Sequence, residues 1–374
     1  MDIGTWVNGG VVGALSEHTV DGLAGRLRDW GFKPGHAARV LRTFYASDGA
    51  NRAGGPGIPA ALRDRLSSEL SGVMATTIRR RVADDGTVKL LLGLGDGLTV
   101  ESVLMPDFRQ DRAAGCLSSQ VGCAMGCDFC ATARGGFVRN LTAGEMVEQF
   151  LALRREARSA GRTLRTVVFM GMGEPLLNLE AVVGAVRRLA DNGLGALGWR
   201  QITVSTVGIV PGIDALTELG LNIHLAVSLH APDDVTRARL LPMGRRYGVD
   251  EILAAADRFQ ARRGRPVTVQ YCLLAGVNDS RDHARELAVR LGGRRMHVNL
   301  LRYNPTGLSL RGVEYAPVEE SVAVAFAEVL RGDGVVAHFR RSRGPDIDAA
   351  CGQLREGTLI PTTENAEHME EGGS

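Results

Sequence analysis

The sequence predicts an α/β fold in which a parallel sheet is curled into a partial barrel of about six β/α units, preceded by a small helical domain. The chain has 374 residues, 44% of them hydrophobic, which is enough for a sizeable core. From about residue 142 to residue 330, apolar runs alternate with amphipathic segments, a pattern typical of parallel strands joined by helical crossovers. The first 82 residues show only short helical patterns broken by glycine and proline.

Hydrophobic periodicity predicts the individual elements. The clearest helix spans 142–161, where Thr142 and Glu145 form a capping box at its start. Its apolar stripe includes Met146 and Phe150. The other predicted helices are 19–31, 34–45, 59–70, 178–193 and 318–330, and the predicted strands are 165–170, 201–207, 222–228, 267–274 and 297–303.

Turn signals and composition divide the chain into four predicted regions. Two apolar runs around Gly95-Asp96-Gly97 are typical of a β-hairpin. The last residues carry glutamates among few apolar side chains, which is typical of a disordered tail. The regions are a helical domain at 1–82, a hairpin connector at 83–108, a barrel with a C-terminal cysteine loop at 109–356, and an acidic tail at 357–374.

Charge and hydropathy predict the environment of the protein. No run approaches the roughly 18 apolar residues that a membrane span needs, and the N-terminus lacks a secretory pattern, so we expect a cytoplasmic protein without membrane contact. The net charge is +2, yet only Lys33 and Lys89 are lysines among the 44 basic residues. Arginine binds phosphate bidentately, so this excess indicates either RNA binding or a bias in genome composition.

Six cysteines in a chain without an export signal indicate metal or redox chemistry. Cys123, Cys127 and Cys130 lie within eight residues, close enough to bind three corners of a cubic iron–sulfur cluster and leave the fourth iron open. Structural zinc sites favour paired CxxC units completed by a fourth cysteine or histidine, and no such pair follows. Zinc binding and inert thiols are the alternatives.

This CxxxCxxC spacing, with Phe129 before the last cysteine, resembles the signature of the radical S-adenosylmethionine (SAM) superfamily. There the open iron of a 4Fe-4S cluster binds SAM, and an electron splits SAM into methionine and a 5′-deoxyadenosyl radical. The resemblance implies SAM contacts at the strand ends of a partial barrel, with Glu174 pairing with the ammonium group. Taken singly, such strand-end residues are more often turn residues. The candidate SAM-binding residues are Gly173, Glu174, Ser205, Ser228, Leu229, His230 and Asn304.

Longer motifs narrow the resemblance to the RlmN/Cfr family of RNA methyltransferases. These are residues 116–123, 171–178, 204–211, 228–232 and 346–354, and the similarity runs from about residue 31 to residue 354. The RlmN type methylates carbon 2 of adenosine in 23S ribosomal RNA and in transfer RNA. One alternative is the Cfr type, which modifies carbon 8 of the same ribosomal adenosine. The alternative from another class is a non-catalytic iron–sulfur or zinc RNA-binding protein.

The resemblance implies a relayed methyl transfer. Cys351 takes a methyl group from one SAM, the radical from a second SAM removes a hydrogen from it, and the methylene adds to carbon 2. Cys116 then attacks the thioether sulfur, which releases the product and leaves a Cys116–Cys351 disulfide for a reductant to reset. A buried inert thiol is the ordinary alternative for both residues, and it is our expectation for Cys272 in its apolar strand. Small neighbours favour an accessible sulfur at Cys351.

A proton must also leave carbon 2. By resemblance Glu101 is its acceptor, and Cys116 is a competing candidate. On the strand 98–105, Glu101 lies opposite Leu98 and Val100, so periodicity predicts a carboxylate that faces solvent.

The resemblance also predicts the partners: 23S rRNA and tRNA as substrates, and an external electron donor of the flavodoxin or ferredoxin type. We expect a monomer. Surface arginines would contact the RNA, although each could equally be a solvated charge, and a target adenosine within folded RNA would need flipping out. The candidate arginines are Arg79, Arg80, Arg81, Arg245, Arg246, Arg262, Arg263, Arg340, Arg341 and Arg343.

Overall fold

The computed structural model describes residues 5–7, 10–242 and 246–355, so the predicted acidic tail at 357–374 lies outside the described residues. Its largest feature is a ten-stranded sheet with the strand order β14-β13-β12-β11-β10-β9-β6-β5-β4-β3. The seven strands from β6 to β14 pair in parallel. They are β6 (Arg112–Leu117), β9 (Thr163–Phe169), β10 (Ile202–Thr206), β11 (His224–Ser228), β12 (Val267–Leu273), β13 (Met296–Arg302) and β14 (Val336–Arg340).

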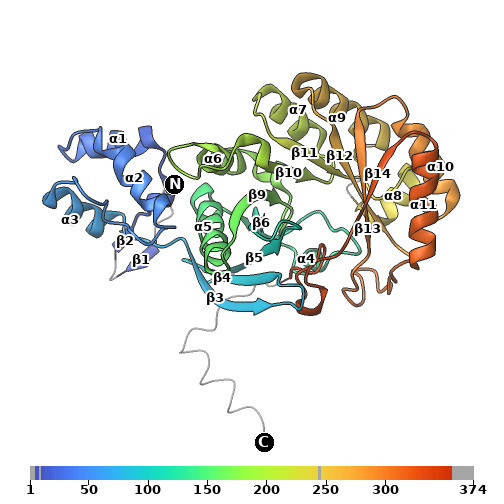
Figure 1. Cartoon of the computed structure of the whole chain (residues 1–374), viewed down its shortest axis with the longest axis horizontal. Coiled ribbons are helices and arrows are strands. Elements are labelled where there is room, and N and C mark those ends of the chain that lie inside the picture. The colour runs from blue at the N-terminus through green and yellow to red at the C-terminus, as the bar shows by residue number, and fades with distance from the viewer. Residues whose placement is uncertain (1–4, 8–9, 243–245, 356–374) are drawn as a thin grey trace, which may run out of the picture.

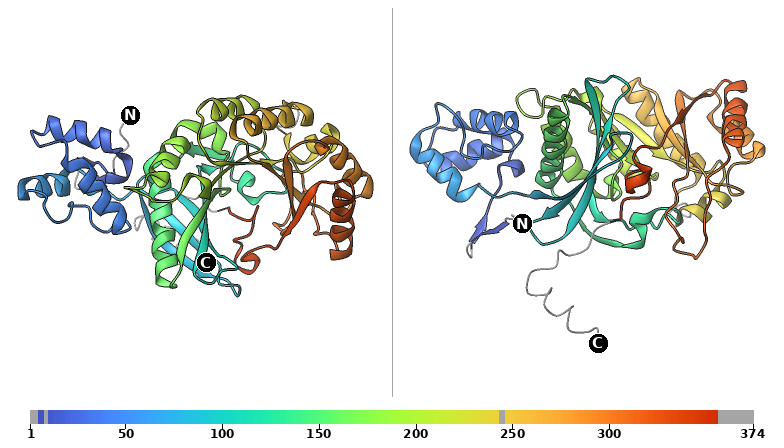
Figure 2. Two further views of the ribbon diagram at one scale, coloured as in Figure 1. Left: turned by 45° about the horizontal axis from the view of Figure 1, so that its top comes forward. Right: turned by 60° about the horizontal axis from the view of Figure 1, so that its bottom comes forward.

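Helices connect each parallel strand to the next, which confirms the predicted partial barrel of six β/α units. They lie on the outside of the curved sheet (Figures 1 and 2). The predicted strands and helices agree with the observed ones to within a few residues. The helices are α5 (Ala143–Ser159), α6 (Leu179–Ala190), α7 (Val210–Glu218), α8 (Asp234–Leu240), α9 (Val249–Arg263), α10 (Arg281–Leu291) and α11 (Glu320–Gly332).

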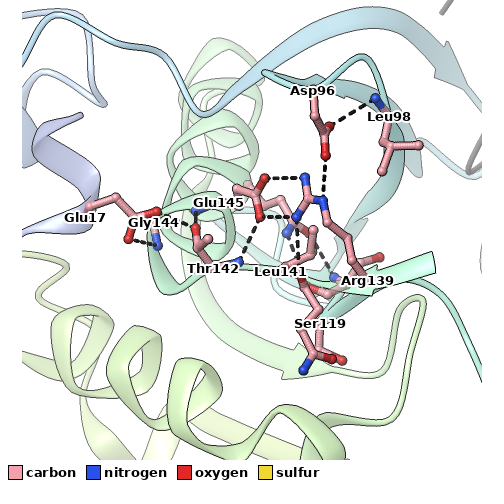
Figure 3. A network of polar contacts seen from close by, with 12 residues as sticks. Glu17, Asp96, Leu98, Ser119, Arg139, Leu141, Thr142, Gly144 and Glu145 are labelled. Atoms are coloured by element: carbon pink, nitrogen blue, oxygen red, sulfur yellow. Dashed lines mark hydrogen bonds and ion pairs between the residues drawn. The ribbon is translucent and has the colours of Figure 1, made fainter. Parts of the chain in front are cut away.

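The start of α5 joins three parts of the molecule. Thr142 Oγ1 accepts a hydrogen bond from the Glu145 amide at 3.1 Å, and Glu145 Oε2 accepts one from the Thr142 amide at 2.8 Å, which confirms the capping box. Arg139 pairs with Glu145 at 2.7 Å and with Asp96 of the hairpin at 2.6 Å (Figure 3). Glu17, from the N-terminal region, accepts a hydrogen bond from the first turn of α5.

The predicted N-terminal helices are confirmed as α1 (Val20–Asp29), α2 (His36–Ala46) and α3 (Ala60–Glu69). They form a separate lobe beside the barrel (Figure 1). Ion pairs with buried carboxylates connect this lobe to α5: Arg52 contacts Glu148 at 3.1 Å, and Asp48 contacts two arginines of the helix.

The predicted hairpin is confirmed as β4 (Val88–Leu94) and β5 (Thr99–Pro106), but it does not stand apart from the barrel. β5 pairs with β6, and the hairpin thereby extends the parallel sheet by antiparallel strands. The end of the expected helical region also differs, because Ala75–Val82 form strand β3 at the edge of this sheet. The division of the chain into domains stays a prediction.

Candidate active site

One face of the sheet carries the predicted site residues that lie on strands, namely Glu101, Cys116, Ser205 and Ser228. Directly paired residues of neighbouring strands point to the same face. Pairing joins Lys89 to Val103 and Val103 to Cys116, and the alternation along β10 and β11 brings Ser205 and Ser228 to this side. The opposite face packs against α5; the strand residue next to Cys116, Gly115, lies directly under that helix. We call the face with Cys116 the inner face.

The three clustered cysteines occupy one loop between β7 (Gln120–Gly122) and α4 (Ala131–Arg134). Burial raises the pKa of Cys123 to about 12 and that of Cys127 well above its usual value, and the charges of the three thiols interact. Among the described residues, no three side chains of metal-binding type converge on a single ion. A cubic cluster does not require such convergence, because each thiolate binds its own iron. Metal binding would deprotonate these thiols.

Asp128, within this loop, was not singled out from the sequence, and the structure shows that it secures the loop. Its buried carboxylate accepts hydrogen bonds from the Tyr315 hydroxyl at 2.7 Å and from the Arg311 amide at 3.2 Å. The Asp128 amide donates to the Leu240 carbonyl at 2.9 Å. A carboxylate between metal-binding cysteines was the only signal for it in the sequence.

Gly173 and Glu174 lie beside the cysteine loop. A side chain at Gly173 would come within 2.5 Å of Gln120, and the backbone there has a φ of +101°, so glycine is required for this close approach. The buried Glu174 carboxylate accepts hydrogen bonds from the amides of Val207 at 2.8 Å and Leu176 at 3.1 Å. Burial nevertheless raises its pKa to about 7. Its charge also interacts with Cys123 and Cys127.

The other predicted SAM contacts lie in different surroundings. Ser205 and Ser228 are half-buried on the inner face, whereas the Leu229 side chain belongs to the core. His230 has a φ of +61°, accepts a hydrogen bond at Nδ1 from the Cys272 amide, and packs against Phe129 of the cysteine loop.

Burial lowers the pKa of His230 to about 3, so its ring is neutral at physiological pH. The side-chain amide of Asn304 donates a hydrogen bond to the Cys351 carbonyl at 3.4 Å, so Asn304 lies beside the C-terminal cysteine.

The C-terminal segment brings Cys351 to the cysteine loop. The Gly352 carbonyl accepts a hydrogen bond from the Ala131 amide at 2.7 Å, and the Leu354 carbonyl accepts one from the Thr132 hydroxyl. This segment, red in Figure 1, therefore lies against α4 although more than 200 residues separate the two.

Cys116 and Cys351 lie close enough for their charges to interact. Desolvation by the surrounding protein raises the pKa of both thiols, that of Cys116 to about 12, although Cys351 keeps solvent-exposed surface. The Cys351 residue is exposed, whereas Cys116 is buried. The expectation that Cys272 is buried is confirmed, and its thiol interacts with those of Cys130 and Cys351.

The prediction that Glu101 faces solvent is wrong. Its side chain is 1% exposed, forms an ion pair with Lys89 Nζ at 2.9 Å and accepts a hydrogen bond from the Arg355 amide at 3.1 Å. Lys89 also donates to the Asp348 carbonyl at 3.0 Å. The C-terminal segment thus covers Glu101, a contact across about 250 residues that strand periodicity cannot indicate. Sequence reasoning also missed Lys89. The one signal for it in the sequence was that it is one of only two lysines.

Some of the candidate arginines have structural partners. Arg263 donates to the Gly220 carbonyl, Arg343 lies 3.8 Å from Asp85, and Arg80 pairs with Glu156 at 2.8 Å. Arg245 lies outside the described residues. No helix in the part of the chain that the structure describes is long and apolar enough to cross a membrane.

Known proteins resemble this chain in sequence and in overall structure. Residues 117–288 match the Radical SAM superfamily. "Probable dual-specificity RNA methyltransferase RlmN 1" of Opitutus terrae is 69% identical over 91% of this chain and 96% of its own length. A similarly named relative from Rhodopirellula baltica is 40% identical over 92% of each chain. The crystal structure of a radical SAM methyltransferase from Sphaerobacter thermophilus is 44% identical, with a TM-score of 0.86, and covers 92% of this chain and 99% of that one.

Identity of this extent over nearly the full length of the relatives, together with the shared fold, establishes the family. Its cofactors are a 4Fe-4S cluster and SAM. This chain belongs to the RlmN family of dual-specificity RNA methyltransferases within the radical SAM superfamily.

Proposed function

We propose that this enzyme methylates carbon 2 of adenosine in 23S rRNA and in tRNA, and that Cys351 carries the methyl group. One observation supports the mechanism most strongly: two cysteines outside the three-cysteine loop, Cys116 and Cys351, lie at the same end of the barrel as that loop, close enough that the Cys351 charge adds to the burial that raises the pKa of Cys116. A non-catalytic RNA-binding protein would have no need for such a pair.

Cys123, Cys127 and Cys130 would hold the cluster, and Glu174 would receive the ammonium group of SAM. Gly173 permits the close approach of its backbone to Gln120. Leu229 would contact SAM through its backbone, because its side chain is in the core. The other proposed contacts are Ser205, Ser228, His230 and Asn304. When bound, the cluster and SAM supply the methyl group and the 5′-deoxyadenosyl radical.

Cys351 and Cys116 have separate tasks in this proposal. Cys351 presents the one-carbon unit to carbon 2 of the adenine. After the carbon–carbon bond forms, the adduct would lose the carbon-2 proton to a base and one electron to the cluster that supplied it, and would so become a closed-shell thioether. Cys116 then loses its thiol proton and attacks the Cys351 sulfur. An S–S bond forms while the bond from the Cys351 sulfur to carbon breaks, and the electron pair of that bond stays with the departing carbon, which is protonated to methyl. Two electrons from a reductant return the disulfide to two thiols.

Glu101 is the proposed acceptor of the carbon-2 proton. Its carboxylate is buried on the inner face and is held by the Lys89 ammonium group at 2.9 Å, so it has the fixed position that a base requires. Cys116 competes less well, because burial raises its pKa to about 12 and keeps it a neutral thiol at physiological pH.

We further propose that the enzyme works as a cytoplasmic monomer with a flavodoxin- or ferredoxin-like electron donor. The need for electrons to reset the disulfide supports the donor, and the absence of disulfides among the described cysteines is compatible with a reducing compartment.

The test is product analysis with the anaerobically reconstituted enzyme, SAM, a reductant, and either a 23S rRNA fragment or a tRNA transcript. Mass spectrometry of the digested RNA should detect 2-methyladenosine in both substrates. A product methylated at carbon 8 would favour the Cfr-type alternative. SAM cleavage without any methylated nucleoside would contradict the proposal.

A further inference from the structure

The edge strand β3 carries three consecutive arginines whose side chains the fold sends to opposite faces of the sheet. The register of β3 on β4 shifts at one point: Thr77 pairs with Leu92, but Arg79 pairs with Leu91, so that Ile78 forms a β-bulge. If the register continued unshifted and Ile78 paired with Leu91, Arg79 and Arg81 would pair with Leu90 and Val88 and point toward α5, because a one-residue slip exchanges the two faces of a strand.

The bulge instead places Arg79 and Arg81 on the inner face. Arg81 pairs with Lys89, which continues through Val103 to Cys116, so Arg81 and Cys116 share a face across four adjacent strands. Arg79, Arg81, Lys89, Leu91 and Glu101 line one small pocket, which shows that the two arginines lie next to the Lys89–Glu101 ion pair.

The middle arginine has the opposite orientation. Arg80 pairs in register with Leu90 and forms an ion pair with Glu156 of α5 at 2.8 Å. All three arginines are exposed, but Arg80 points to the helical face, whereas Arg79 and Arg81 lie on the side of the sheet that carries Cys116.

We infer that Arg79 and Arg81, on the face to which the register of β3 turns them, bind the phosphate backbone of the substrate RNA next to the target adenosine. This inference rests on the proposed function. Three strand spacings separate Arg81 from Cys116, roughly 15 Å, which is the span of a few nucleotides. Four of the pocket residues are charged, three positively and one negatively, so the surface carries the excess positive charge that a phosphate chain requires.

The experiment compares the double variant Arg79→Gln/Arg81→Gln with Arg80→Gln, its control from the same arginine triplet. Binding of a fluorescent tRNA transcript to the reconstituted holoenzyme is measured at several salt concentrations. Each lost phosphate contact lowers the slope of log K against log salt by about 0.7–0.9, so the double variant should lose about 1.5 in slope and roughly tenfold in affinity at moderate salt. Arg80→Gln should stay within about twofold of the wild type, because its side chain lies on the other face.

A second pair of variants tests the bulge. Deletion of Ile78 removes the bulge but leaves Arg79 opposite Leu91 and Arg81 opposite Lys89, so a folded deletion variant should bind RNA normally, as should Ile78→Val. Wild-type affinity and slope in the double variant, or an equal loss in Arg80→Gln, would overturn the inference whether or not the deletion variant folds.

The two proposals can fail separately. SAM cleavage and methylation of Cys351 without RNA should be unchanged in the double variant, since these steps do not use the arginines. A wild-type enzyme that binds RNA through these residues but produces no 2-methyladenosine would contradict the proposed function and leave the RNA-binding surface intact. Normal product formation with an unchanged KM in the double variant would contradict the RNA-binding role of Arg79 and Arg81 and leave the proposed function intact.

Discussion

Strand β6 and the C-terminal loop at 344–355 each carry one of the two cysteines of the proposed relay, and the fold holds them differently. Cys116 is buried in a strand paired on both sides, with β5 and with β9. Cys351 is an exposed residue in a loop held by separate hydrogen bonds to the cysteine loop, to Asn304 and to the hairpin.

This difference indicates that Cys351, and not Cys116, moves during the proposed relay. A sheet strand with neighbours on both sides opens only with the whole sheet, whereas a loop held by single contacts can open locally. The residue that must receive a methyl group, meet the base and then meet the second thiol is the one in the loop. Lys89 is central to this arrangement because it holds both the loop, at the Asp348 carbonyl, and Glu101.

Replacing either cysteine should abolish turnover, in a different way for each. These are the largest effects that we expect. Cys351→Ala should leave RNA unmodified, because no residue carries the methyl group. Cys116→Ala should be methylated at Cys351, react once, and remain joined to RNA through a methylene thioether, because no thiolate releases it. A ribonuclease-sensitive band on a denaturing gel would identify the adduct; normal turnover of Cys116→Ala, or identical behaviour of the two variants, would exclude the relay.

Lys89→Met should release the loop and lower kcat by at least tenfold, because removing one partner of a buried ion pair costs about 3–5 kcal/mol. SAM affinity should change little. Lys89→Arg should restore part of the loss, since the charge is kept but its geometry changes.

Hydrogen exchange at residues 345–355 would measure the release directly. Lys33→Met, at the only other lysine and an exposed one, is the control. Unchanged exchange in Lys89→Met would show that Lys89 does not hold the loop.

The fixed side of the site should show a pH dependence. Burial raises the pKa of Glu174 to about 7, so its carboxyl is neutral below that pH and ionised above it. SAM affinity should therefore rise with pH through about 7 and fall up to about tenfold per unit below it. Calorimetry between pH 6 and 8 measures this. Glu174→Gln should bind weakly with no such dependence, and an equally steep dependence in that variant would implicate another group; His230 is excluded because its pKa lies near 3.

Cys272→Ala should have the smallest effect. This thiol interacts with Cys130 and Cys351 but packs in an apolar cluster with Phe129 and Leu240. Its loss should cost about 1–2 kcal/mol of unfolding free energy and leave product formation within about twofold. Methylation assays and thermal unfolding test this; a large loss of activity with normal iron content would give Cys272 a part in the chemistry.

The sequence by itself determined the local elements and the identity of the chemistry. The strand periodicity around 165–170 and 267–274, the capping box at Thr142 and the cysteine spacing from Cys123 to Cys130 are all short-range patterns. Each depends on residues within one element or one loop, so the same physical preferences act in any context. The six β/α units followed from repeating that pattern.

Only the tertiary structure decided which groups meet. Glu101 is buried because a segment some 250 residues later covers it, and Arg79 and Arg81 lie on the same face of the sheet as Cys116 because the register of β3 shifts at Ile78. The hairpin is part of the main sheet because β5 pairs with β6. These outcomes depend on pairings between distant segments, and local hydrophobic periodicity carries no information about which distant segment covers a given face.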